Sequence, residues 1–260
     1  MMPDDPRDLP ASSLTGADHA PAVADRARRR RLRRRAWLAC LLIGGPAFAL
    51  YFHRPLFGGN LGVVEDGVVY RSAQPVGDVA GLIRARRLGS ILNLRGGKTS
   101  DAWYVAEVKA AEAAGVDFYD LPLSAVRRPT RAELLSVIDV LDRCRYPLLI
   151  HCKSGSDRTG LAAGLYLMAR KGVPPERAEE AFSLAHGHVP LLGPERLHEP
   201  FDEYAAWLAA TGADHTPARL VQWVKDHYRA DDHFAATDPV RPGPRARRQA
   251  KNEAGLTTLR

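Results

Sequence analysis

The decapeptide HCKSGSDRTG, residues 151–160, places a thiol, a glycine and a guanidinium within a few positions of one another. The apolar run of residues 147–150 before it predicts a short buried strand, and the apolar run of residues 161–169 after it predicts a helix. A tight turn from strand to helix directs several backbone N–H groups to one point, where the helix dipole favours negative charge. The sequence therefore predicts an anion-binding loop that contains Cys152.

The side chains of this loop suit nucleophilic attack on a phosphate ester. Cys152, at the start of a helix and close to an arginine, should lose its proton readily and be a thiolate. Arg158 can hold two phosphoryl oxygens with its planar fork, and Gly155 lets the loop close around the anion. The hydroxyl of Thr159 can bond the sulfur and help it leave, and His151 can orient the loop. A cysteine beside a histidine is often inert, so glycine, arginine and threonine are what favour catalysis.

The pattern His-Cys-x-x-Gly-x-x-Arg-Thr resembles the signature of the cysteine-dependent protein tyrosine and dual-specificity phosphatase superfamily. Residues 60–75 and 91–95 resemble the opening of small bacterial dual-specificity-like phosphatases, and the likeness extends over residues 58–230. The resemblance implies phosphomonoester hydrolysis through a phosphocysteine on Cys152, with Thr159 assisting its breakdown and no cofactor. The substrate-binding residues that it implies are Arg158 and the loop positions Lys153, Ser154, Gly155 and Ser156.

The general acid has two candidates. Many members of the superfamily take an aspartate from a separate upstream loop, before a proline-opened helix, and alignment on Pro129 places Ala125 there. Asp120 is the nearby aspartate on that side, and a solvated strand end is its competing interpretation. Asp157 directly precedes Arg158, as in myotubularin-like lipid phosphatases and some secreted bacterial phosphatases, which this ending resembles. We therefore expect Asp157 to protonate the leaving oxygen, with a brace for the loop as its alternative role.

The elements that must position the loop alternate between strands and helices. A capping box from Thr130 to Glu133 marks the start of the helix before the central strand. Strands are predicted as a hairpin over 61–70 and at 90–95, 116–123 and 147–150; helices are predicted at 78–87, 101–114, 130–143 and 161–169, and near 175–186, 195–210 and 216–228. This order predicts an α/β fold, a single domain with a central, mostly parallel sheet flanked by helices. Functional groups are then expected where strands run into helices.

The net charge of +7 is concentrated at the ends of the chain. Residues 26–35 contain eight arginines and no acid, and residues 241–260 carry +5, whereas residues 1–25 carry −4. Residues 36–240 are left with −2, and a DNA-binding domain would carry its basic excess on the folded part. Nucleic acid is therefore not an expected partner.

Residues 36–52 contain no charge and directly follow the arginines. This pattern predicts a single transmembrane anchor, or a signal peptide cleaved after residues 47–49, with the arginines in the cytoplasm. The predicted domains are a disordered arm over 1–35, the anchor, a phosphatase domain over 58–230 and a disordered basic tail over 231–260. In a bacterium the catalytic domain would face the periplasm from the inner membrane.

The substrate is less clearly indicated by the sequence. Lys153 beside the cysteine, with Arg127 and Arg128 on the facing loop, suits a polyanionic head group, although each is equally compatible with a solvated surface charge. A membrane tether would hold the site near lipid phosphates. We therefore expect extracytoplasmic phosphorylated lipids, glycolipids or phosphoproteins as substrates, and a phosphate-binding membrane module without turnover is the alternative.

The remaining cysteines and histidines predict little further chemistry. Cys144 lies eight residues before Cys152, so it is either a resolving thiol for the oxidised nucleophile or a half-buried bystander. Three cysteines do not make a disulfide framework. The histidines show no paired ligand spacing beyond His186 and His188, so we predict no metal site.

Overall fold

The computed structural model describes residues 20–39, 42, 45, 59–190 and 193–230, and the chain divides into two compact units, Met1–Leu50 and Tyr51–Arg260. In the first unit, helix α1 (Ala20–Ala39) includes the arginine block. The prediction of a disordered arm as far as residue 35 is therefore wrong from residue 20 onward. Alanine, arginine and leucine are all strong helix formers, which explains a helix in this composition.

The predicted membrane anchor falls mainly on residues outside the described part of the chain. Positions 40–41, 43–44 and 46–52 belong to that set, as do the two ends of the chain over 1–19 and 231–260. Among the residues that are described, no helix combines the length and the apolar character needed to cross a bilayer. The anchor and the disordered tails therefore remain predictions.

The second unit is built on a five-stranded sheet in the order β1-β2-β5-β3-β4. Its strands are β1 (Gly62–Glu65), β2 (Val69–Ser72), β3 (Ser90–Asn93), β4 (Asp117–Asp120) and β5 (Leu148–His151). β1 and β2 form the predicted antiparallel hairpin, and the other three pairs are parallel. The prediction of a mostly parallel sheet is therefore confirmed, with β5 at its centre.

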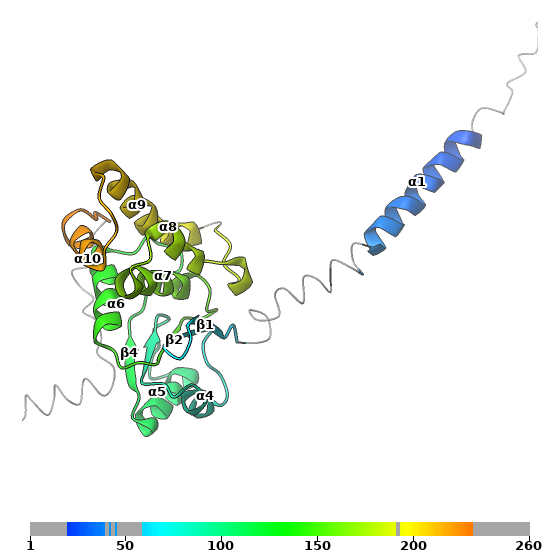
Figure 1. Cartoon of the computed structure of the whole chain (residues 1–260). Helices are drawn as coiled ribbons and strands as arrows, with labels where there is room; N and C mark the ends of the chain where they lie inside the picture. Colours follow the sequence, from blue (N-terminus) through cyan, green and yellow to red (C-terminus); the bar gives the residue numbers. More distant parts are fainter. Residues whose placement is uncertain (1–19, 40–41, 43–44, 46–58, 191–192, 231–260) are drawn as a thin grey trace, which may run out of the picture. The chain divides into compact units, whose positions relative to one another are not determined.

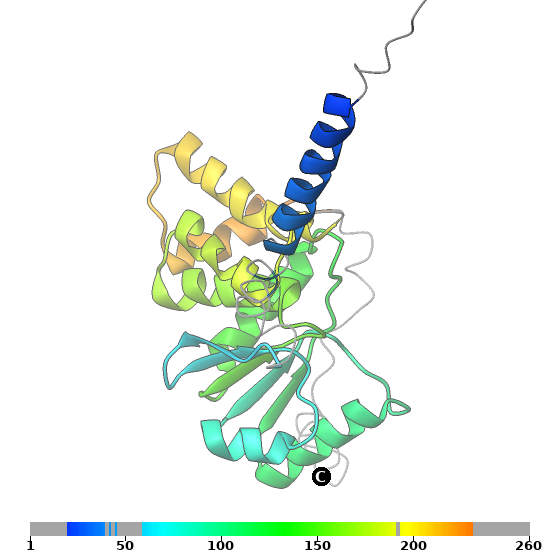
Figure 2. The ribbon, with the colours of Figure 1, turned by 90° about the vertical axis from the view of Figure 1, so that its right-hand side faces the viewer.

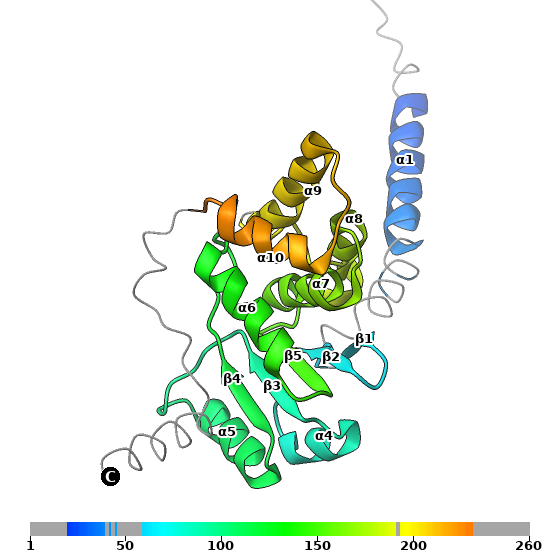
Figure 3. The same cartoon turned by 60° about the vertical axis from the view of Figure 1, so that its left-hand side comes forward.

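Helices cover both faces of the sheet (Figures 1 and 3). α4 (Val79–Arg86) and α5 (Ala102–Ala114) pack on one face; α6 (Arg131–Arg143), α7 (Asp157–Lys171), α9 (Glu199–Thr211) and α10 (Pro217–Asp226) lie on the other. Each face of the sheet has its own hydrophobic core, because successive side chains of a strand point to opposite faces. Leu149 packs in the core with α4 and α5, whereas Leu148 and Ile150 pack in the core with α6 and α7. The predicted capping box of Thr130 and Glu133 starts α6.

The continuous helix predicted near 175–186 is wrong. That segment is divided into α8 (Pro175–Ala178) and two short 3-10 turns, η2 (Glu179–Ala181) and η3 (Leu184–His186). Arg71 donates to the carbonyl oxygen of Ala181 at 2.6 Å, so a side chain occupies an acceptor near the point where the helix would continue. Phe182 is buried in the core at this break. Figure 2 shows the sheet between α4 and α5 on one side and the later, yellow and orange helices on the other.

Candidate active site

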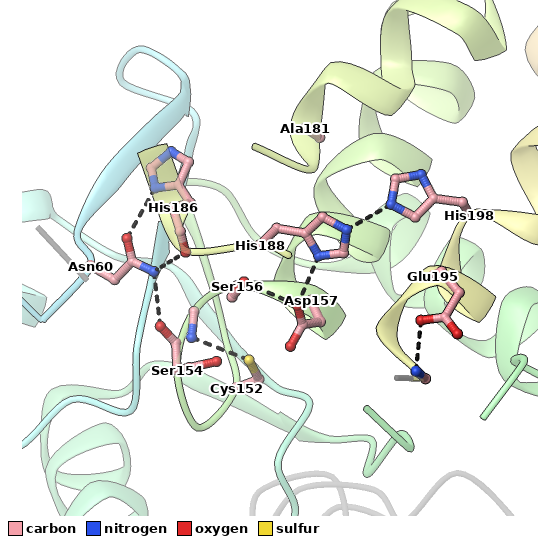
Figure 4. A network of polar contacts seen from close by, with 12 residues as sticks. Asn60, Cys152, Ser154, Ser156, Asp157, Ala181, His186, His188, Glu195 and His198 are labelled. Atoms are coloured by element: carbon pink, nitrogen blue, oxygen red, sulfur yellow. Dashed lines mark hydrogen bonds and ion pairs between the residues drawn. The ribbon is translucent and has the colours of Figure 1, made fainter. Parts of the chain in front are cut away.

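The predicted anion-binding loop connects β5 to α7 at the carboxyl end of the central strand. Cys152 directly follows β5 and is 1% exposed, and the N–H of Gly155 donates to its Sγ at 3.3 Å (Figure 4). Gly155 has φ +73°, and a Cβ there would lie 2.5 Å from the backbone nitrogen of Ala73. The loop therefore closes on the sulfur at a position that requires glycine.

Arg71 braces this loop from β2, a role that the sequence did not predict. Its Nη2 donates to the carbonyl oxygens of Gly155 at 3.0 Å and Ser156 at 3.3 Å. Burial lowers the pKa of Arg71 to about 10, while the negative charges of Cys152 and Asp157 act to raise it. The guanidinium is therefore charged at neutral pH and holds the loop carbonyls away from the anion site. The sequence signal was slight, an arginine directly after the predicted hairpin of residues 61–70, and only the structure shows that all four residues of β2 are buried.

The ring of His151 contacts a buried carboxylate on α5, that of Glu107. His151 Nε2 lies 2.9 Å from Glu107 Oε1, both side chains are fully buried, and Gln74 donates to the other oxygen of Glu107 at 2.7 Å. The His151–Glu107 contact meets the distance of an ion pair but lacks the alignment of a hydrogen bond. His151 Nδ1 lies 3.4 Å from the carbonyl oxygen of Cys152, so the ring links the loop to α5.

Arg158 and Thr159 occupy the first turn of α7. Arg158 Nη1 donates to the carbonyl oxygens of Leu94 and Leu123, each at 3.2 Å, which holds its stem across the ends of the neighbouring strands. Among the described residues, the buried Nε of Arg158 and Oγ1 of Thr159 have no hydrogen-bond partner. Unpaired buried polar atoms in the loop of the predicted nucleophile suit a ligand with acceptor oxygens, and a phosphoryl group has such oxygens.

The two candidate acids differ in their surroundings. Asp157 is the first residue of α7 and its side chain is 20% exposed; its Oδ1 accepts from Ser156 Oγ at 3.1 Å and lies 2.8 Å from His188 Nδ1. Asp120 is 4% exposed and accepts from Asn93 at 3.1 Å and Tyr104 at 2.9 Å. The interpretation of Asp120 as a solvated strand end is therefore wrong: it braces β3, β4 and α5.

Of the basic residues predicted to bind substrate, two form ion pairs within the protein and one is exposed on the loop. Arg127 pairs with Glu133 at 2.6 Å, and Arg128 pairs with Glu203 at 2.6 Å, with its guanidinium 4.7 Å from the centre of the Tyr228 ring. Both charges are therefore already used to hold the 121–130 loop against α6 and α9, and their role as substrate contacts stays a prediction. Lys153 and Ser154 lie exposed on the loop beside Cys152.

Cys144 lies at the other end of β5 from Cys152. It ends α6, and the next residue donates its backbone N–H to Ser90 Oγ at the start of β3. The length of β5, about 13 Å at about 3.3 Å per residue, separates the two cysteines, whereas a disulfide needs Cα atoms within about 7 Å. Burial also raises the pKa of the Cys144 thiol. The bystander interpretation of Cys144 therefore fits this fold.

The structure separates the two histidines that were spaced like a ligand pair. His186 Nδ1 lies 3.1 Å from Asn60 Oδ1, whereas His188 contacts Asp157 on one side and His198 on the other (Figure 4). Among the described residues, no group of three or more histidine, cysteine or carboxylate side chains converges as a metal site. The sequence did not predict that His188 lies at the phosphate loop with His198 behind it, because both are distant from the loop along the chain.

The part of the chain that contains the loop is similar to known phosphatases. Residues 102–211 match a family described as the tyrosine phosphatase family. The dual-specificity protein phosphatase TpbA of Pseudomonas aeruginosa is 29% identical over 155 residues, which cover 56% of this chain and 67% of that protein. The matched family range contains the whole loop from Cys152 to Thr159.

Solved structures are similar at lower identity. A crystal structure of P. aeruginosa TpbA has a TM-score of 0.46 at 25% identity, covering 65% of this chain and 92% of that one. A putative phosphatase from Neisseria meningitidis has a TM-score of 0.42 at 22% identity, covering 54% of this chain and 95% of that one.

Proposed function

Because the chain belongs to the cysteine-dependent protein tyrosine and dual-specificity phosphatase superfamily and is a phosphoric monoester hydrolase, we propose that it acts through a phosphocysteine on Cys152. The observation that carries this proposal is the geometry of the loop. The sulfur of Cys152 is buried, accepts the N–H of Gly155 at 3.3 Å, and lies at the positive end of α7. The phosphate-binding membrane module, which would not turn over substrate, is accordingly set aside.

The first step forms the phosphorus–sulfur bond. The thiolate of Cys152 attacks phosphorus, and the bond to the leaving oxygen breaks as that oxygen takes a proton from Asp157. Arg158 and the loop amides bind the remaining phosphoryl oxygens, whose negative charge also favours the protonated form of Asp157 beside them. Arg71 keeps the loop carbonyls directed away from this charge.

The second step reverses the role of the acid. Water attacks the phosphocysteine, the carboxylate of Asp157 takes the proton of the water, and the phosphorus–sulfur bond breaks to release inorganic phosphate. The hydroxyl of Thr159, buried and without a partner among the described residues, donates to the departing sulfur. Atoms and protons balance over the two steps, and neither step requires a metal.

Replacement of the nucleophile tests the proposal directly. Cys152→Ser should abolish release of phosphate from an aryl phosphate while the protein still binds phosphate, because Arg158 and the amides remain. Arg158→Lys should lose both binding and rate, since an ammonium group cannot form the planar fork. A Cys152→Ser enzyme with more than about a hundredth of the wild-type rate would exclude thiolate catalysis, because loss of a nucleophile costs far more.

The site is proposed to act outside the cytoplasm, tethered by residues 36–52. The support is the uncharged segment directly after eight arginines, which should remain in the cytoplasm. A reporter that is active only outside the cytoplasm, fused after residue 210, should be active, and the same reporter fused at residue 20 should be inactive. The opposite pair of results would reverse the orientation.

Phosphorylated lipids or glycolipids of the outer leaflet, each with one accessible phosphomonoester, are the proposed substrates. A tethered site would lie close to such head groups. Arg127 and Arg128 already form ion pairs with carboxylates of the protein, so they are not free to bind additional phosphates of a polyanionic head group. A panel of phospholipids, phosphorylated glycolipids and phosphopeptides, with Cys152→Ser as the blank, tests this choice. Selective turnover of phosphopeptides would replace the lipid assignment with a protein substrate and leave the phosphatase chemistry intact.

A further inference from the structure

A row of four titratable side chains runs from the phosphate loop into the helical layer around α8 and α9, and Figure 4 shows its first three members, Asp157, His188 and His198. Asp157 Oδ1 lies 2.8 Å from His188 Nδ1, and His188 Nε2 lies 2.7 Å from His198 Nε2. His198 Nδ1 in turn contacts Glu179 Oε1. We name these four residues the Asp157–Glu179 chain. Only its first member belongs to the catalytic loop.

The other three members of this chain come from three segments outside α7, and packing fixes the two imidazole rings. His188 follows η3 and is 3% exposed, His198 lies between η4 (Pro194–Leu197) and α9, and Glu179 starts η2. The ring of Phe182 stacks on His198 at a centroid distance of 4.0 Å and contacts His188 at 4.9 Å. The imidazoles therefore cannot turn away from each other without opening this packing.

The number of contacts determines how many protons the chain holds. Three consecutive contacts need three shared protons, one for each donor and acceptor pair. Two neutral imidazoles supply only two, so with both carboxylates ionised one contact would set lone pair against lone pair. The three contacts therefore need one further proton, on an imidazole or on a carboxyl group. With this proton in place the four groups together carry a charge of −1, and they carry none while Oδ2 of Asp157 is also protonated.

The acid proton of Asp157 has a place outside this row. Ser156 and His188 both contact Oδ1, so Oδ2 is the oxygen from which Asp157 can protonate a leaving group. While Oδ2 carries that proton, His188 Nδ1–H donates to Oδ1, and the stored proton is best placed far away, on His198 or Glu179. Once Oδ2 has lost its proton, the stored proton is best placed on His188, beside the new negative charge.

We propose that His188 is a positioning residue for Asp157, and that the stored proton of the chain moves toward Asp157 as this residue protonates the leaving oxygen. This inference rests on the proposed role of Asp157 as the acid. Each imidazole accepts a proton on one nitrogen and passes one from the other, so the three contacts keep their three protons while the acid proton leaves from Oδ2 of Asp157. The proton that water gives to Asp157 in the second step sends the stored proton back.

The other charged groups around the Asp157–Glu179 chain do not contact the carboxylate of Asp157 as His188 does. Arg71 on β2 acts on both Cys152 and Asp157 through its positive charge, but it is hydrogen-bonded to loop carbonyls. Cys152 and Arg158 belong to the proposed phosphate site, and Arg158 donates to the carbonyl oxygens of Leu94 and Leu123. Asp202 on α9 lies near the far end, where burial and the charge of Glu179 raise its pKa and His198 lowers it. A negative charge at that end favours retention of the stored proton.

The test compares substrates with poor and good leaving groups. Loss of a general acid lowers the rate by about 10²–10⁴-fold for poor leaving groups, and acidic phenols need little protonation. His188→Ala should lower kcat/KM for an alkyl phosphate by at least about tenfold, while kcat/KM for an aryl phosphate with an acidic phenol stays within about threefold. His188→Asn keeps a donor near Nδ1 but loses the contact with His198, so it should recover only part of the alkyl rate.

Controls separate this inference from the proposed function. His227→Ala, an exposed histidine after α10, should match the wild type for both substrates. If Asp157→Asn loses alkyl turnover selectively but both His188 variants keep the wild-type ratio, the chain has no role and the proposed acid stands. If Asp157→Asn lowers both substrates alike, the acid assignment fails and this inference fails with it. Should His188→Ala not fold, His188→Asn and His198→Gln decide by the same ratio.

Discussion

Replacement of Gly155 by alanine measures how closely the phosphate loop approaches β2. A Cβ at this position would lie 2.5 Å from both Ala73 N and Ser72 C, and 2.6 Å from Ser72 O. These are backbone atoms, and the N–H of Ala73 is held by the carbonyl oxygen of Gly59 at 2.8 Å. They cannot swing aside as a flexible side chain can, so the loop itself must move.

Gly172 provides a matched control for the size of this effect. It ends α7 with φ +65°, close to the +73° of Gly155, and a Cβ there would meet nothing within 4 Å. An alanine in this left-handed conformation costs about 1–2 kcal/mol of folding free energy at either site. The steric overlap adds about 1–3 kcal/mol at Gly155 alone. We therefore expect a loss of about 1–2 kcal/mol for Gly172→Ala and about 2–5 kcal/mol for Gly155→Ala.

Urea unfolding followed by tryptophan fluorescence measures these losses, and turnover of an aryl phosphate measures the effect on the site. The N–H of Gly155 donates to the sulfur of Cys152, so displacing the loop should lower kcat by about 10- to 1,000-fold. Gly172→Ala should keep wild-type kcat. If the two variants were equally stable and equally active, the close approach of the loop to β2 would be wrong.

Three further predictions follow from the surroundings of the loop. Arg71→Met removes two buried hydrogen bonds to the carbonyl oxygens of Gly155 and Ser156 and a partly buried one to that of Ala181. It should cost about 2 kcal/mol or more in the free energy of urea unfolding and lower kcat. Asp120→Asn should cost about 1–3 kcal/mol in stability and lower alkyl and aryl turnover alike; a selective alkyl loss would make Asp120 the acid. Cys144→Ser should leave unchanged both the rate at which peroxide inactivates the enzyme and the activity recovered after adding a thiol. If the variant instead loses activity irreversibly and faster than the wild type, Cys144 protects the oxidised Cys152 as a resolving thiol.

The strands and helices of the catalytic unit were largely predictable because their signals are local. Apolar runs of four residues, a capping box at Thr130 and turn glycines mark the elements within a few positions of themselves. The loop at 151–159 was predictable for the same reason, since Cys152, Gly155 and Arg158 lie within seven consecutive positions from the end of a strand to the first turn of a helix. Short-range spacing determines which backbone N–H groups and side chains face the anion.

The partners of that loop were decided by the tertiary structure. Arg71 reaches Gly155 across 84 positions of the chain, and Asp157 meets His188 across 31. No periodicity links such positions, because each contact depends on how β2 pairs with β5 and on where the segment after α8 turns. The predicted helix at 175–186 was broken by the same contacts, since Arg71 takes the carbonyl oxygen of Ala181. Local spacing in the sequence thus predicted Cys152 as the nucleophile and the loop around it as the anion site, whereas the packing of distant segments determined what braces the loop and which groups surround Asp157.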